Sequence, residues 1–95
     1  MRRSMLDILA CPIDKYYPLE LFEIDTTIDT TINETVIKEG VLFCSQCSRI
    51  YPIIEEIPVM LPDELRDKEK DIEFLKKWQE KIPTKITKNG FPWHL

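Results

Sequence analysis

The sequence predicts an α+β fold, a small antiparallel β unit followed by a C-terminal helix. Three observations predict it. Short apolar stretches separated by polar turns fill residues 17–61, which is typical of strands. Apolar residues then recur mostly three or four positions apart over residues 65–82, the spacing of an amphipathic helix. The chain has 95 residues, enough for one small domain.

Four extended segments are expected before the helix, over residues 17–25, 36–44, 49–54 and 57–61. Residues 6–10 predict one helical turn or a short strand. The Thr- and Asp-rich residues 25–35 are expected either to extend the first two strands or to form a long connection, and Gly40 is a candidate break in the second. Because proline cannot donate to a sheet ladder, we expect Pro52, Pro58 and Pro62 in edge strands, short strands or strand ends.

The C-terminal helix is expected to begin after Pro62, where Asp63 and Glu64 suit a helix start, and to stop before Pro83. Residues 84–95 are predicted to form a loose tail, with aromatic and apolar side chains available for docking. We therefore divide the chain into a β domain over residues 1–66 and a helix and tail over residues 67–95 that pack on the same domain.

Charge and composition exclude several classes of protein. Residues 1–61 carry five Lys or Arg against ten Asp or Glu, and residues 62–95 carry eight against seven. Neither part has the clustered basic residues of a nucleic-acid surface, so we expect RNA to be reached only indirectly, through a partner. No apolar run approaches the ~20 residues that cross a bilayer. The apolar stretch near the N-terminus is too short for a signal peptide and is interrupted by Asp7, which predicts a cytoplasmic protein.

The three cysteines form the strongest local pattern. Cys44 and Cys47 are spaced as a metal knuckle, and Cys11 begins a Cys-Pro-Ile-Asp stretch that places Asp14 where a fourth cysteine would complete a second knuckle. Three interpretations compete: zinc held by these cysteines with Asp14 or water as fourth ligand, a metal-free knuckle, and a Cys44–Cys47 disulfide. Since only three of four cysteines are present, we favour the metal-free knuckle over zinc, and a cytosolic disulfide is the least expected.

The sequence offers little for catalysis. The single histidine, His94, lies next to the C-terminus, and Gly40 and Gly90 are the only glycines. Phosphate-binding and dinucleotide-binding loops need several glycines for close backbone approach to the ligand. Asp14 is more simply a turn or knuckle residue than a catalytic acid. We predict that the protein is not an enzyme.

Beyond these patterns, the chain resembles the small activator subunit shared by tRNA, ribosomal-RNA and release-factor methyltransferases. The resemblance lies in residues 6–12, 18–21, 39–44, 47–53 and 57–66, which read LDILACP, PLEL, EGVLFC, CSRIYPI and IPVMLPDELR. It implies a zinc-ribbon-like β domain that forms heterodimers with class I methyltransferases, covers an apolar patch on them and adds an edge strand. The partner would carry S-adenosylmethionine and the catalytic residues. The chain departs from the family pattern at Asp14, and residues 25–35 replace a large helical insertion found in longer members.

The residues themselves point to a partner surface in the last extended segment, Ile57, Pro58, Val59, Met60 and Leu61, hereafter the partner segment. Its apolar side chains would lie on both faces of the segment. One face would pack on the domain core, and the other would remain exposed, which usually marks an interface. The competing interpretation of this segment is that it forms a strand buried in the domain's own core. The rival function is a free-standing zinc-ribbon module that binds RNA or a ribosomal surface, for which the tail offers Lys81, Lys85, Lys88 and Trp93.

Overall fold

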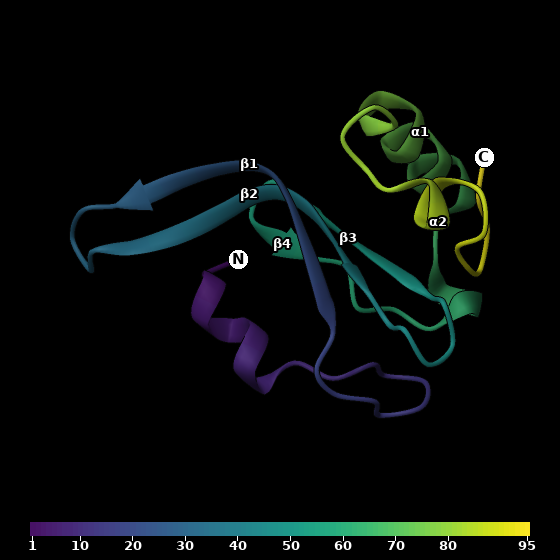
Figure 1. Cartoon of the computed structure of the whole chain (residues 1–95), viewed down its shortest axis with the longest axis horizontal. Helices are drawn as coiled ribbons and strands as arrows, with labels where there is room; N and C mark the ends of the chain where they lie inside the picture. The colour runs from purple at the N-terminus through teal and green to yellow at the C-terminus, as the bar shows by residue number, and fades with distance from the viewer.

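The structure, a computed structural model, describes residues 1–95 and combines one antiparallel sheet with short helices at both ends of the chain (Figure 1). A 3-10 helix comes first, and it overlaps only the first three of residues 6–10, for which the sequence predicted a helical turn or a short strand. Four strands follow it. A second 3-10 helix and two α-helices complete the chain. In order, the elements are η1 (Arg3–Ile8), β1 (Glu20–Asp29), β2 (Glu34–Phe43), β3 (Ile50–Ile54), β4 (Ile57–Pro58), η2 (Asp63–Leu65), α1 (Lys68–Trp78) and α2 (Thr84–Thr87). The predicted α+β class is confirmed.

The four strands form a meander in the order β1-β2-β3-β4, with every neighbouring pair antiparallel. β1 and β2 pair from Glu20↔Phe43 to Asp29↔Glu34, whereas β3 pairs only with the last part of β2. The outer half of the β1–β2 hairpin therefore projects beyond the sheet, as Figure 1 shows at the left. Residues 25–35 extend both strands, and the turn closes with Asn33 at a φ of 52°, a conformation that asparagine tolerates better than most residues.

β2 continues through Gly40, so the strand does not break at this candidate position and the irregularity lies opposite it, in β1. The pairing register shifts between Glu23 and Asp25, which is the signature of a β-bulge. Gly40 is needed there for space, because a Cβ atom on it would lie 2.9 Å from the carbonyl oxygen of Phe22.

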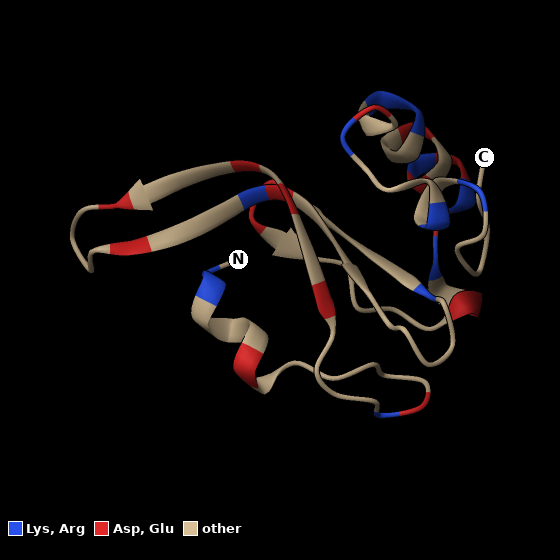
Figure 2. Cartoon of the chain, viewed as in Figure 1, with Lys and Arg blue, Asp and Glu red and all other residues tan.

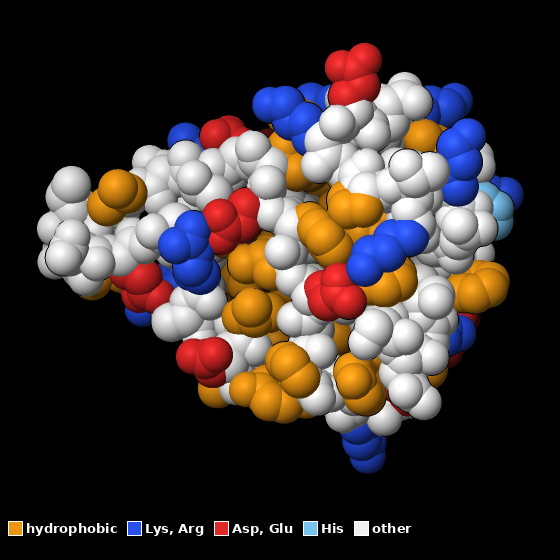
Figure 3. Space-filling view, in the orientation of Figure 1, with side chains coloured by type: hydrophobic (Ala, Val, Ile, Leu, Met, Phe, Trp, Pro, Cys, Tyr) orange, Lys and Arg blue, Asp and Glu red, His pale blue; other side chains and the backbone are white.

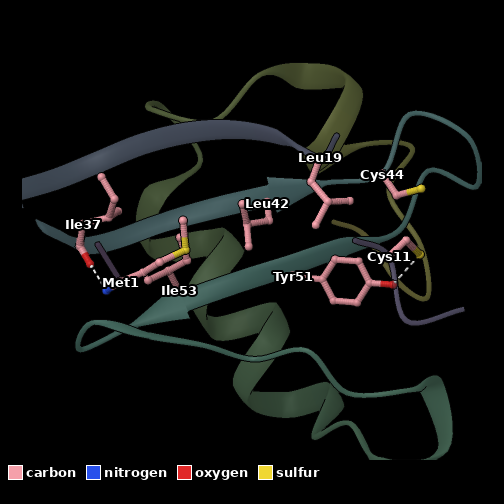
Figure 4. Packing of buried hydrophobic residues seen from close by; sticks show 8 residues of the cluster. All are labelled: Met1, Cys11, Leu19, Ile37, Leu42, Cys44, Tyr51 and Ile53. Carbon is pink, nitrogen blue, oxygen red and sulfur yellow. Dashed lines mark hydrogen bonds between the residues drawn. The ribbon is translucent and has the colours of Figure 1, made fainter. Parts of the chain in front are cut away.

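The sheet is covered on both faces, because successive side chains of β2 and β3 alternate between two cores. The knuckle-side core contacts the N-terminal segment and is drawn in Figure 4; the helix-side core contacts α1 and the chain after it. The first contains Met1, Cys11, Leu19, Ile37, Leu42, Cys44, Tyr51 and Ile53. The second contains Val41, Phe43, Ile50, Phe74, Leu75, Ile82 and Ile86.

The C-terminal helix begins five residues later than Asp63, the start that the sequence predicted. Residues 63–65 form the separate turn η2, and Arg66 is extended, with φ −84° and ψ 147°. The side chain of Asp67 then accepts a hydrogen bond from the Lys70 N–H at 3.2 Å and caps α1. Leu65 is consequently exposed rather than part of the apolar helix face. None of the helices is both long and apolar enough to cross a bilayer.

The prediction of a loose tail over residues 84–95 is wrong. Residues 84–87 form α2, and the backbone of Phe91 lies beside the start of β3, donating to Ser48 O at 2.8 Å and accepting from Ile50 N at 2.9 Å. Trp93 donates from Nε1 to Asp71 Oδ2 at 3.0 Å. Tertiary hydrogen bonds hold a segment that has no strong local pattern of its own.

Pro52 contradicts the expectation for prolines, because it is buried in β3, an inner strand of the sheet. In an antiparallel strand the N–H and C=O of one residue point to the same side. The carbonyl of Pro52 accepts from Val59 N at 2.8 Å, so its nitrogen also faces that side, where β4 has already ended. The missing donor therefore costs little. Pro58 does lie in the edge strand, as predicted.

We predict that Gly40→Ala lowers the free energy of unfolding by about 1–3 kcal/mol, because the new methyl group must push the β1 backbone away. Urea denaturation would measure it. Thr27→Ala, at an exposed position of β1, is the control and should change stability by no more than about 0.5 kcal/mol. Equal effects of the two substitutions would contradict the proposed close approach.

Candidate functional site

Two short turns with the same backbone geometry face each other at one end of the knuckle-side core. In the first turn, Lys15 N donates to Cys11 O at 2.8 Å; in the second, Ser48 N donates to Cys44 O at 2.8 Å. Lys15 and Ser48 both have a φ of 62°. The backbone N–H of the leading cysteine then donates to the carbonyl five residues on, at 3.0 Å in the first turn and 2.9 Å in the second.

The matching geometry of the two turns shows which residue of the second turn corresponds to Asp14. Asp14 occupies the same place in the first turn as Cys47 does in the second. The spacing of Cys11 and Asp14 is therefore that of a complete knuckle in which a carboxylate replaces the second thiol. The sequence could suggest this correspondence, but only the repeated hydrogen bonds establish it.

The four side chains converge on one point. Their candidate ligand atoms all lie within 4.8 Å of one another, and Cys11 Sγ is 3.7 Å from Cys47 Sγ. Cys44 Sγ lies 3.5 Å from Asp14 Oδ2. A tetrahedral zinc ion with ordinary bond lengths would place two sulfurs about 3.8 Å apart and a sulfur and an oxygen about 3.5 Å apart. The arrangement fits a metal ion, and the cluster could hold one.

Hydrogen bonds and burial set the protonation of this cluster. The backbone N–H of Tyr16, 2.9 Å from Asp14 Oδ1, is the largest influence that holds the pKa of Asp14 below its usual value, with smaller contributions from the cysteines. Burial raises the pKa of the Cys44 thiol to about 12. A metal ion bound here would therefore have to displace a proton from Cys44.

The three cysteines form no disulfide, and their sulfurs converge with the Asp14 carboxylate as candidate metal ligands. Tyr51 places its hydroxyl 3.0 Å from Cys11 Sγ, and Figure 4 shows this contact. Tyr51 is fully buried. The cluster is thus joined to the core by β3.

The partner segment lies at the edge of the sheet and is open to solvent. Ile57 and Leu61 are exposed, at 65% and 38%, while Pro58, Val59 and Met60 are half-buried. Met60 packs against the knuckle-side core. No residue of the segment is buried, so the structure excludes a core strand. Apolar side chains reach the surface in several places over the sheet and near η1, broken up by single charges, in the view of Figure 3.

Two arginines form hydrogen bonds with the end of the partner segment and with the residues just after it. Arg49 makes two hydrogen bonds to the carboxylate of Asp63, at 3.0 and 2.8 Å. Arg66 donates from Nε to Leu61 O at 3.0 Å. Sequence reasoning missed both roles, because each depends on a contact that no local spacing encodes.

The residues offered for RNA binding are partly engaged in the fold. Lys85 pairs with Glu20 at 2.9 Å and lies over the rings of two phenylalanines. Trp93 is bonded to Asp71. Figure 2 shows basic residues interleaved with acidic ones on α1, further basic residues on the segment after it, and mostly acidic residues along the β1–β2 hairpin. His94 bonds the backbone oxygen of Gly90 and is not among the clustered ligands.

Comparison with known proteins identifies a family and a solved structure that are similar to this chain. The family model described as Trm112p-like protein matches residues 2–56, a range that includes both knuckles and ends just before the partner segment. Among solved structures, the chain is similar to one in a complex between the Haloferax volcanii Trm112 methyltransferase activator and a candidate methyltransferase. The identity is 39% and the TM-score 0.55, and the similarity covers 70% of this chain and 100% of the other. The search of curated proteins finds no match.

The Arg49–Asp63 pair predicts a pH dependence of stability. Because Arg49 holds the pKa of Asp63 below its ordinary value of 3.8, the pair stabilises the fold fully above that pH. This contribution is lost as the pH falls through the lower pKa of the folded state. Asp63→Asn should therefore destabilise the protein at pH 7 and have a much smaller effect near pH 2. Thermal unfolding across this range measures the difference, and a pH-independent effect would contradict the assignment.

Proposed function

The chain belongs to the Trm112p-like protein family, and from this membership we propose that it is a non-catalytic subunit that binds and activates methyltransferases. The observation that carries the proposal is the partner segment, an apolar stretch at a free sheet edge with Ile57 65% exposed. A similar chain occurs in a complex of a methyltransferase activator with a candidate methyltransferase.

The geometry suggests how such a subunit acts. β4 pairs with β3 on one side only, so its other side can add backbone hydrogen bonds to a partner's sheet edge. Exposed apolar side chains beside that edge can cover an apolar patch of the enzyme. A partner that binds only the folded enzyme stabilises it, by about 2.7 kcal/mol when present at 100 times its Kd.

In this proposal the enzyme supplies the chemistry. The partners are class I methyltransferases that bind S-adenosylmethionine and act on tRNA, ribosomal RNA or a release factor, and this chain reaches RNA only through them. The activator domain comprises residues 1–66, and residues 67–95 form a helical module packed on it.

We also propose that Cys11, Asp14, Cys44 and Cys47 bind zinc. The repeated knuckle geometry and the ligand spacing support this occupant, and they outweigh the preference for a metal-free site that the missing fourth cysteine suggested. Zinc would supply a structural cross-link between the N-terminal segment and the turn that joins β2 to β3.

Protein purified without chelator should contain about one zinc per chain, and Cys44→Ser should lose it, because a hydroxyl is a far weaker ligand than a thiolate. Elemental analysis measures the content. Asp14→Cys should retain zinc and bind it more tightly in a competition with a chelator. Gln46→Ala, an exposed position in the same turn, is the control and should keep full occupancy. Metal-free wild-type protein would refute the site.

Ile57→Lys and Val59→Asp should abolish co-purification with a co-expressed methyltransferase from the same organism, since each places a charge in the apolar contact. Ile28→Lys is a matched control, because Ile28 in the hairpin is 64% exposed, almost the same as Ile57. Circular dichroism should show all three variants folded.

Retention of the complex by both partner-segment variants would show that the interface lies elsewhere. Salt-dependent RNA binding by the isolated chain would favour the rival RNA-binding module instead.

A further inference from the structure

Arg66 is a buried charged residue that belongs to neither hydrophobic core. Its side chain is 0% exposed, and it follows η2 in an extended conformation just before α1. It contacts three different parts of the molecule. These are Leu61 O, 3.0 Å from Nε; the Tyr51 ring, whose centroid is 4.6 Å from Cζ; and Asp71 Oδ2, 3.5 Å from Nη1.

The hydrogen bonding of Arg66 is incomplete. Its Nη2 atom is buried without a partner, and an unsatisfied buried donor destabilises the folded state, more so when it is charged. Replacing a buried ion pair by apolar groups of similar volume is often neutral or stabilising. The burial of Arg66 is therefore not by itself evidence of a stabilising role, and its three contacts indicate a role in orientation.

On one side, Arg66 joins the partner segment to the sheet. The Leu61 carbonyl is turned inward to the guanidinium, while the Leu61 side chain remains 38% exposed. The guanidinium lies over Tyr51, which is fixed by full burial and by its hydroxyl contact with Cys11. The end of the partner segment is thereby tied to the strand that supports the cysteine cluster.

On the other side, the C-terminal module orients Arg66. Asp71 lies on α1, and its Oδ2 also accepts the Trp93 Nε1 hydrogen at 3.0 Å. Both residues lie outside residues 2–56, the part matched by the family model. Trp93 of the tail thus hydrogen-bonds the same carboxylate oxygen that faces the guanidinium.

We propose that Arg66 is the positioning residue of the partner segment, and that residues 67–95 act as a clamp that keeps Arg66 oriented through Asp71 and Trp93. The segment is then held extended before the partner arrives, so less conformational entropy is lost on binding. This inference rests on the proposed function, since it is the partner that makes the order of this segment matter.

Hydrogen exchange on the isolated chain tests the positioning role. The double variant Arg66→Met/Asp71→Asn removes both buried charges with little change of volume and leaves an acceptor for Trp93. We expect the amides of Val59 and Leu65, which bond Pro52 O and Pro62 O, to exchange at least about tenfold faster, while the slowest amides of β2 keep their rates. Trp93→Phe should give a smaller acceleration at the same two amides.

The matched control is Arg3→Met/Glu23→Gln, which removes an exposed ion pair of 2.7 Å and should leave Val59 and Leu65 unchanged. Unchanged exchange in the Arg66→Met/Asp71→Asn variant would overturn the inference. So would an equal acceleration in β2, because that would indicate a general structural role.

The same double variant should bind about tenfold more weakly to a methyltransferase that co-purifies with the wild-type chain, because its segment must be ordered on binding. Unchanged affinity would overturn the clamp role. Failure of the proposed function is distinguishable, since the wild-type chain would then co-purify with no methyltransferase, whatever the exchange rates.

Discussion

The pairing of β2 with β3 is the interaction on which the rest of the structure depends. The two strands pair over Gly40↔Ile53 to Phe43↔Ile50, and their side chains are buried on both faces of the sheet. A sheet covered on both sides needs two layers, and the chain supplies one from each end. The N-terminal segment closes one face, and α1, α2 and the tail close the other. Neither end of the chain would have an apolar surface to pack on without this strand pair.

The candidate metal cluster follows from the same constraint. The turn that leaves β2 carries Cys44 and Cys47, and the segment that covers the adjacent face brings Cys11 and Asp14 against them. Tyr51 of β3 reaches the cluster from below. Because both knuckles repeat the same backbone hydrogen bonds, a carboxylate can take the place of a thiol without a change in the backbone.

The partner segment is open because β3 has only a two-residue neighbour on its outer side. The chain leaves the sheet after Pro58, and Arg49 and Arg66 fix where it goes next. Arg66 touches Tyr51 of one core and Asp71 on the helix that contributes to the other. Through Arg66, the segment is therefore connected to both halves of the molecule.

Local chemistry by itself determined that four extended segments lie in the first two thirds of the chain and that Cys11, Asp14, Cys44 and Cys47 are candidate metal ligands, because alternation, turn residues and cysteine spacing act over a few neighbouring positions. It also determined that Ile57 to Leu61 is apolar, although not that the segment is exposed. Tertiary structure decided what depends on residues far apart in the chain. The helix starts at Lys68, after the extended Arg66 and the Asp67 cap, and Pro52 is accepted in an inner strand because its nitrogen faces the end of β4. The tail is ordered by Ser48, Ile50 and Asp71, partners that no local pattern in residues 84–95 could reveal.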